Sequence, residues 1–282
     1  MQRAPTRLFG KALIAAVAFW LSCSLALAQS GGAVLQADAW PALASQIFHN
    51  RPLRDGNAVL AIDAPYRADD AALVPVTIRS LLPPNDPRRI RRITLVIDVN
   101  PSPLAAVFVL GKDSGIDSIS TRVRIDDYTH VHAVAELSDG SLYAVERFVK
   151  AAGGCSAPAV KQTAGDVPLG TMRLRQFSAA AGTRTDDPRE AELMIRHPNY
   201  SGMQMDQLSR LYIPAHFIQS VTIWQGEQQL LHIDSGISIS ENPAFRFDYR
   251  RNGATMFRAK ATDNKGQSFS GEWPEAGATP SG

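Results

Sequence analysis

Short runs of β-branched and aromatic residues, in which apolar and polar positions alternate, recur along most of the 282-residue chain. Phe245, Phe247 and Tyr249 alternate with charged residues, so their side chains would share one face of a strand. Clusters of Pro, Asn, Asp and Gly separate the runs. The pattern predicts strands over Ala58–Ile62, Leu73–Ser80, Ile90–Val99, Ala105–Leu110, Ser118–Ile125, Val131–Leu137, Leu142–Val149, Thr171–Phe177, Glu190–Arg196, Phe217–Trp224, Gln228–Ile233, Ala244–Tyr249 and Thr255–Thr262.

One segment has a different period. Between Ala37 and His49, the apolar residues Trp40, Leu43 and Ile47 recur near helical spacing, which predicts one short N-terminal helix. Evenly spaced short strands with so little helix are typical of an all-β protein. The prediction is two immunoglobulin-like or fibronectin-like β-sandwiches of about 100 residues each.

The composition changes in the middle of the chain. Residues 151–170 are mostly small and include few large apolar side chains, as in a flexible Gly/Ala/Pro linker. This predicts a first sandwich over residues 29–150, a linker over residues 151–170 and a second sandwich over residues 171–276. Residues 277–282 are predicted to be a disordered tail.

The N-terminus has the composition of a secretory signal peptide. It has three cations and no acid, an apolar run over Ala12–Leu27, and the small-x-small pattern Ala26-Leu27-Ala28. The sequence therefore predicts a Sec-type signal peptide over residues 1–28 and a mature periplasmic protein with no membrane attachment. Cys23 would leave with the signal peptide, so Cys155 would be the one remaining cysteine.

Charge and motifs exclude several classes of function. Loss of the three signal-peptide cations would leave 26 of the 29 Lys and Arg against 27 Asp and Glu, which argues against a nucleic-acid partner. The chain contains no Gly-x-Ser-x-Gly elbow, Walker loop, Rossmann glycine pattern or Cys-x-x-Cys pair. The sequence predicts no catalytic residue, no cofactor and no metal ligand, and hence a protein that is not an enzyme.

Cys155 is the candidate for chemistry. A lone thiol in an oxidising compartment cannot form an internal disulfide, so it indicates a reactive role or a disulfide dimer through Cys155. Gly153 and Gly154 precede it and Pro158 follows, which predicts an exposed thiol on a mobile arm. A thiolate in such a place can attack electrophilic sulfur or carbon and hold the product covalently.

Other polar clusters have simpler explanations. His130 and His132 would share a strand face as a metal site requires, but no further ligand lies nearby in the sequence, which favours a solvent-facing pair. The four arginines between Arg88 and Arg92 are typical of a solvated loop and strand edge, or of a docking patch for an acidic partner. Asp126-Asp127 is most simply a turn.

Several longer motifs stand out. Gly153-Gly154-Cys155 ends the first half, and the second half contains four further stretches, Met194–Gly202, Tyr212–Ile218, Glu241–Phe247 and Thr262–Gly266. The first motif is similar to the sulfur-carrying arm of SoxY, and the four stretches resemble SoxZ, the second subunit of the same periplasmic sulfur carrier. The order of the two halves in one polypeptide is similar to that of SoxYZ-like carriers associated with quinoprotein dehydrogenases.

The resemblance implies a function. An immunoglobulin-like SoxY half would carry thiosulfate-derived sulfur on Cys155, with Gly153 and Gly154 as the slender arm that enters a partner's pocket. The SoxZ half, fibronectin-like, would be a scaffold and docking surface. The implied partners are c-type cytochromes, sulfur-oxidising enzymes such as a thiosulfohydrolase, or a quinoprotein dehydrogenase.

The sequence also departs from the family. The arm of a separate SoxY is a free C-terminus with glycines on both sides of the cysteine, whereas here Ser156-Ala157-Pro158 follow and the chain continues. The cargo and partners could therefore differ. Two alternatives stay open on the residues alone. One is a non-covalent accessory module that docks onto a periplasmic dehydrogenase or cytochrome, with Cys155 incidental. The other is a metal chaperone that uses His130 and His132.

Overall fold

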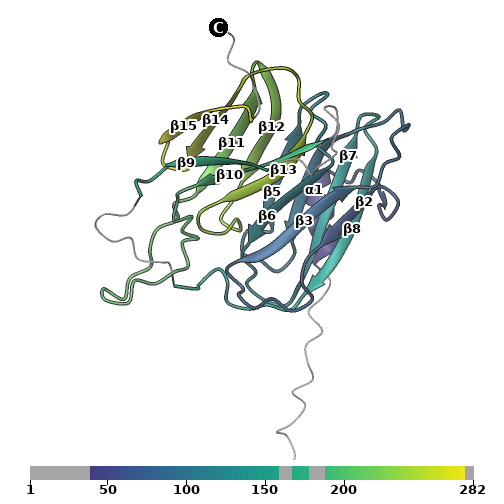
Figure 1. Cartoon of the computed structure of the whole chain (residues 1–282). Coiled ribbons are helices and arrows are strands. Elements are labelled where there is room, and N and C mark those ends of the chain that lie inside the picture. Colours follow the sequence, from purple (N-terminus) through teal and green to yellow (C-terminus); the bar gives the residue numbers. More distant parts are fainter. Residues whose placement is uncertain (1–38, 159–166, 178–187, 277–282) are drawn as a thin grey trace, which may run out of the picture. The chain divides into compact units, whose positions relative to one another are not determined.

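The computed structural model describes residues 39–158, 167–177 and 188–276 (Figure 1). The predicted signal peptide over residues 1–28, the tail over 277–282 and residues 159–166 of the predicted linker lie outside the described residues. Among the described helices, none combines the length and the apolar character that crossing a membrane requires.

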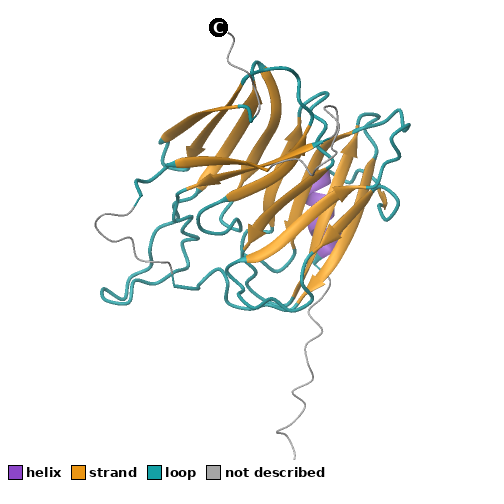
Figure 2. Ribbon diagram, viewed as in Figure 1, coloured by secondary structure: helices purple, strands orange, loops and turns teal. Residues whose placement is uncertain are grey.

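In the described residues every regular element except one short helix is a strand (Figure 2). The short N-terminal helix, α1, spans Trp40–Phe48, as the apolar spacing predicts. Pro41 in its first turn and the left-handed His49 after its last residue bound it. The strands are β1 Leu53–Asp55, β2 Leu60–Asp63, β3 Val74–Ser80, β4 Ile90–Ile97, β5 Leu104–Leu110, β6 Ser118–Val123, β7 Thr129–Leu137, β8 Leu142–Val149, β9 Met172–Phe177, β10 Arg189–Ile195, β11 Ile218–Gln225, β12 Gln228–Ser235, β13 Ala244–Tyr249, β14 Met256–Asp263 and β15 Ser268–Pro274.

Each half of the chain contributes strands to two sheets. The larger sheet has the order β1-β8-β7-β4-β5-β12-β11-β14-β15, and the smaller one has the order β2-β3-β6-β13-β10-β9. The first half therefore pairs five strands of one sheet with three of the other, and the second half pairs four with three. This confirms the predicted all-β class with two immunoglobulin-like or fibronectin-like sandwiches and one short helix.

The two halves join edge to edge, which the sequence did not predict. Strand β5 pairs antiparallel with β12, with Phe108 opposite Ile233, and β6 pairs antiparallel with β13, with Ile119 opposite Phe247. An unpaired strand edge is a template for association with other chains, so this pairing removes one edge from each sheet of each half. The halves are thus connected by hydrogen-bonded strands as well as by the covalent chain.

The alternation of the strands explains the core. In β6 every second side chain is buried, and in β13 the alternating residues Phe245, Phe247 and Tyr249 all face inward. One continuous apolar cluster includes residues from both halves, among them Phe108 of β5 and Phe245 of β13, whose rings meet edge to face at 6.4 Å. The shared cluster explains why the two sandwiches form one core.

Helix α1 covers the outer face of the larger sheet. Its Phe48 packs against Val134 of β7 and Leu142 of β8. Trp40 stacks on the ring of His132 at a centroid distance of 3.7 Å, and His132 Nε2 lies 3.0 Å from a carboxylate oxygen of Asp98. The prediction that His130 and His132 form a solvent-facing pair is therefore wrong for His132, which is 2% exposed because the helix lies over this face.

Candidate functional site

Cys155 lies in the segment that follows β8, and its side chain is buried. Its exposed fraction is 0%, and among the described residues it is the one free cysteine. The prediction of an exposed thiol on a mobile arm is therefore wrong for this state of the protein. The segment that contains Cys155 is held by residues that the sequence analysis did not predict as site residues. We call Ala71, Ile125, Asp126 and Ser201, which contact it, the Cys155 seat.

The two glycines serve close approach of backbones. The N–H of Gly153 donates to the carbonyl of Asp126 at 2.8 Å, and the N–H of Gly154 donates to that of Ile125 at 2.9 Å. A Cβ added to Gly154 would lie 2.1 Å from the carbonyl oxygen of Ala71, which no side chain can tolerate. Gly153 has open space around it but a φ of +78°, which favours glycine. The two glycines therefore allow the backbone before Cys155 to lie directly against the sandwich.

The second half of the chain completes the seat. The hydroxyl of Ser201 donates to the carbonyl of Cys155 at 2.5 Å. The side chain of Gln204, which is 1% exposed, accepts the backbone N–H of Ser201 at 2.8 Å and so fixes this residue. Sequence reasoning missed Ser201 as a site residue. The sequence feature that could have identified Ser201 is its place in the His-Pro-Asn-Tyr-Ser-Gly motif, because the polar side chains of such a motif need hydrogen-bond partners when they are buried.

Buried polar groups surround the thiol. Burial raises the pKa of Cys155 to about 12, the Asp126 carboxylate contributes through its charge and a hydrogen bond, and Arg124 opposes the shift. Arg124 is 2% exposed and donates to the carbonyl of Ile239 at 2.6 Å. Burial lowers the pKa of Arg124, while Cys155 and Glu241 act in the opposite direction. Burial, reinforced by Asp126 and opposed by Arg124, thus keeps the thiol protonated.

The thiol of Cys155 is a poor nucleophile while it is buried in the seat. With a pKa of about 12, the thiolate would be roughly one part in 10⁵ at pH 7, against a few per cent for a free cysteine. The thiolate is the nucleophile. Chemistry at Cys155 therefore requires the segment to leave the seat, or a partner to displace the carboxylate and supply a base.

An apolar loop lies beside the seat. Leu208, Leu211 and Tyr212 are 84%, 69% and 66% exposed. The carboxylate of Asp206 accepts the backbone N–H groups of Leu208 and Ser209, at 3.1 and 2.8 Å, and holds the turn that presents them. Because the backbone N–H of Ile213 donates to the carbonyl of Gln204, this loop is tied to the residue that fixes Ser201. Exposed apolar side chains on an ordered turn are typical of contact surfaces.

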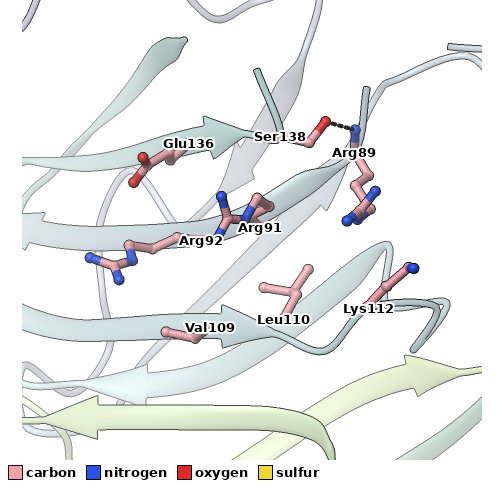
Figure 3. Close-up of a pocket in the computed structure, with 8 residues that line it drawn as sticks. All are labelled: Arg89, Arg91, Arg92, Val109, Leu110, Lys112, Glu136 and Ser138. Atoms are coloured by element: carbon pink, nitrogen blue, oxygen red, sulfur yellow. Dashed lines mark hydrogen bonds between the residues drawn. The ribbon is translucent and has the colours of Figure 1, made fainter. Parts of the chain in front are cut away.

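A basic cavity lies at the other end of the larger sheet. Arg89, Arg91, Arg92 and Lys112 line a cavity of about 350 Å³ together with Glu136 (Figure 3). It opens near the start of β4, whereas Asp126 of the Cys155 seat donates its backbone N–H to the side chain of Asn100, beyond the end of β4, at 2.9 Å. Glu136, the acidic residue in the lining, is paired with Arg51 at 3.2 Å, so the other charged groups give the cavity a strongly cationic character. It is not the rim of the thiol site.

Comparisons with known proteins place one family match in each of the two halves of the chain. The family model of the sulfur oxidation protein SoxY matches residues 44–155, and that of the sulphur oxidation protein SoxZ matches residues 177–274. No curated protein matches the chain. The SoxY match ends at Cys155 itself.

Solved structures of similar proteins cover single halves of the chain. The sulfur carrier protein SoxY from Chlorobium limicola f thiosulfatophilum has 26% identity and a TM-score of 0.33, over 40% of this chain and 94% of that one. A superoxide reductase (neelaredoxin) from Ignicoccus hospitalis has 14% identity and a TM-score of 0.30, over 33% of this chain and 79% of that one. A putative superoxide reductase from Thermotoga maritima has 15% identity and a TM-score of 0.27, over 35% of this chain and 92% of that one.

The two tandem family matches define the class of the protein, a sulfur-oxidation carrier built from two β-sandwiches. The chain belongs to the SoxYZ-like family, with a SoxY half followed by a SoxZ half in one polypeptide. This confirms the resemblance that the motifs carried. The assignment rests on the two matches, which together span most of the chain.

Proposed function

We propose that this protein holds a sulfur-containing intermediate covalently on Cys155 and presents it to partner redox enzymes in the periplasm. The observation that carries the proposal is the seat itself. Both halves of a SoxYZ-like chain contribute groups that hold one thiol, and that thiol is the last residue of the SoxY match. The protein would be a carrier of substrate and not a catalyst.

The chemistry of loading can be written with thiosulfate as the cargo. The Cys155 thiolate and the outer sulfur of S₂O₃²⁻ form an S–S bond, which gives Cys155–S–S–SO₃⁻ and releases two electrons. A c-type cytochrome would accept them, and a partner hydrolase would later cleave the sulfonate as sulfate. A quinoprotein dehydrogenase, whose quinone can take up two electrons, is the alternative acceptor. The proton of the thiol leaves before the attack, so loading requires the unseated form.

The seat gives the carrier two states. The hydrogen bonds from Gly153, Gly154 and Ser201 hold the segment closed. At about 1 kcal/mol net for each bond, they favour the closed state by roughly a hundredfold. A partner that binds the open arm more tightly by a similar amount would reverse this balance. The closed state would protect the thiol from oxidation and from a disulfide dimer, because a dimer through Cys155 needs two open arms.

The apolar loop is a suitable place for a partner to dock. Leu208, Leu211 and Tyr212 are exposed on the loop that continues from Gln204, which fixes Ser201. A partner that buried this loop would therefore touch the residue that holds the carbonyl of Cys155. We propose that docking on the loop and opening of the seat are coupled in this way.

One observation favours a second function. The buried thiol, with its pKa of about 12, is also what a non-covalent docking module with an incidental cysteine would show. The two functions differ in the phenotype of Cys155→Ser. The carrier predicts loss of growth or flux on a reduced sulfur compound with normal amounts of folded protein. The docking module predicts full flux.

The experiment replaces the chromosomal gene with the Cys155→Ser variant. Flux is measured with the protein quantified in the periplasmic fraction, which also tests the predicted export. The matched control is Ser156→Ala, a substitution at the exposed position next to the cysteine. Full flux in Cys155→Ser would end the carrier proposal, and loss of flux in both variants would point to a structural effect.

A further inference from the structure

Two histidines and an aspartate converge inside the second half. His197 follows β10, His216 precedes β11, and Asp263 is the last residue of β14. Their exposed fractions are 0%, 8% and 1%. One nitrogen or oxygen of each lies within 4.8 Å of the others. All three belong to motifs by which this half resembles SoxZ, and the carrier function described above makes no use of them.

Asn199 determines which nitrogen of His197 faces the cluster. Its Oδ1 accepts the backbone N–H of Ile218 at 3.0 Å, and its Nδ2 donates to the carbonyl of Ile239 at 3.3 Å, which fixes the two ends of the amide. Nδ1 of His197 lies 2.8 Å from that Oδ1 and accepts the backbone N–H of Asn199 at 3.1 Å. Both contacts with Asn199 are made at Nδ1, so Nε2 is the nitrogen that faces the cluster.

His197 Nε2 faces the interior of the cluster. It is fully buried and has no hydrogen-bond partner. Oδ2 of Asp263 lies 3.8 Å away, beyond hydrogen-bond distance. A buried polar atom without a partner is costly, and a metal ion bound to Nε2 would satisfy it. This unsatisfied atom points to a ligand.

Asp263 is oriented toward the same point. Its Oδ1 accepts the backbone N–H groups of Lys265 and Gln267, at 2.9 and 2.8 Å. Its Oδ2 is left for the cluster and lies 2.7 Å from His216 Nε2. One carboxylate oxygen thus holds the orientation of the side chain while the other faces both imidazoles. Such support of a ligand by surrounding hydrogen bonds is usual in metal sites.

We propose that His197, His216 and Asp263 bind one divalent transition-metal ion, with Zn²⁺ as the best fit. Imidazole nitrogen and carboxylate oxygen are its usual ligands, at about 2.0 to 2.2 Å. Tetrahedral geometry then requires the ligand atoms to be about 3.3 Å apart. The two separations that involve Asp263, 2.7 and 3.8 Å, lie on either side of this value, and all three ligand atoms lie within 4.8 Å of one another.

Binding exchanges a proton for the metal. His216 Nε2 lies 2.7 Å from Asp263 Oδ2, which indicates a shared proton; when the ion enters, this proton leaves Nε2 and the neutral imidazole carries its one proton on Nδ1. The side chain of His216 is 10% exposed, which gives the ion and a fourth ligand from solvent a way in. Three protein ligands with one open position are a known arrangement for zinc.

The site adjoins the Cys155 seat. Asn199, which orients His197, shares the carbonyl of Ile239 with the guanidinium of Arg124. Two residues further along the chain, Ser201 donates to the carbonyl of Cys155. A metal at His197 would therefore stiffen the segment that closes the seat, and its removal would make Cys155 easier to label.

The test uses the full chain, stripped with EDTA and titrated with Zn²⁺ by calorimetry and with Co²⁺ by absorption. We expect one equivalent of metal and a visible spectrum of four-coordinate Co²⁺. His197→Gln and His216→Gln should each weaken binding at least about tenfold. The matched control is His232→Gln, which removes an imidazole that faces an aspartate at 3.2 Å in the same half but outside the cluster. Cys155→Ser should also bind normally.

A measurement on the wild-type chain keeps the site testable if the histidine variants fail to fold. X-ray absorption of the Zn²⁺ complex should show two imidazoles, light oxygen or nitrogen ligands and no sulfur. Absence of stoichiometric binding by the wild-type chain would overturn the site, as would equal binding by the double His197→Gln, His216→Gln variant. Sulfur in the zinc shell would assign the metal to Cys155 instead. None of these outcomes depends on whether Cys155 carries cargo.

Discussion

At the scale of single residues, the reactivity of Cys155 depends on burial and on two charged neighbours. The thiol is enclosed by the seat, and Asp126 favours its protonated form while Arg124 opposes this. A seated thiol is therefore stored, and the open arm is the reactive species. The ratio of the two states can be measured by alkylation, because a small reagent reaches the open thiol alone.

The first prediction concerns the pH dependence of that alkylation. The pKa of about 12 in the seat lies above the ordinary value near 8.5. Closure therefore stabilises the protein fully below pH 8.5, and this contribution is lost as the pH rises toward 12. The labelling rate of the native protein should keep rising about tenfold per pH unit through pH 8.5 and up to pH 10. In urea, the same thiol should level off near pH 8.5.

Stopped-flow labelling with a small alkylating reagent checks this, with intrinsic fluorescence to show that the native protein stays folded. A native profile that levels off near pH 8.5, at the rate of the unfolded chain, would show that the thiol is not sheltered.

The second prediction concerns Gly154. In Gly154→Ala the new Cβ meets the carbonyl oxygens of Ala71 and Ile125, which belong to the backbone and cannot move aside. Such overpacking costs about 1 to 3 kcal/mol, so the segment should leave the seat. We expect native labelling of Cys155 at least about fivefold faster than in wild type, with little change in thermal unfolding. The measurement is the labelling rate at pH 7.

Gly140→Ala is the matched control for that experiment. Gly140 has a positive φ, +83°, with nothing within 4 Å, and it lies in the hairpin between β7 and β8. The substitution adds a Cβ and backbone strain without a clash, so its labelling rate should match wild type. If Gly154→Ala also labels at the wild-type rate, the seat does not control access to the thiol.

At the scale of elements, alternating patterns predicted thirteen of the fifteen described strands, and β1 and β15 were missed. In β13 the inward residues Phe245, Phe247 and Tyr249 were assigned to one face from their spacing, and the structure buries all three. Helix α1 was likewise predicted from Trp40, Leu43 and Ile47. These elements follow from local periodicity, which a single sequence displays directly.

The candidate site was predicted less well, because contacts between distant residues decide it. Gly153-Gly154 indicates either a mobile arm or a close approach of two backbones, and the second reading needs Ala71 and Ile125 to be placed first. His132 was assigned to solvent because the position of α1 over its strand face was unknown. Asp126 was interpreted as part of a turn. It lies far from Cys155 in the sequence, and only the fold brings the two residues together.

At the scale of the whole molecule, the two halves share their sheets. The β5–β12 and β6–β13 pairs continue each sheet across the boundary, and one apolar cluster spans it. The Cys155 seat depends on this arrangement, since Ser201 belongs to the second half. Fusion of the halves also keeps them together at high effective concentration.

The third prediction follows from that shared core. A specific protease site inserted between residues 159 and 166, which include Lys161, should allow complete cleavage. The fragments should still elute together in size-exclusion chromatography without denaturant, because the strand pairs and the apolar cluster hold them. The same sample in urea is the control and should separate. Fragments that elute apart under native conditions would contradict the edge-to-edge pairing.

The covalent load on Cys155 is the central claim, and intact-mass spectrometry tests it most directly. The protein is purified without reductant from the periplasm of its own cells, grown with and without a reduced sulfur compound. We predict sulfur-containing adducts that a thiol reductant removes, that map to the peptide with Cys155, and that depend on the sulfur compound. A bare thiol under every growth condition would contradict the account.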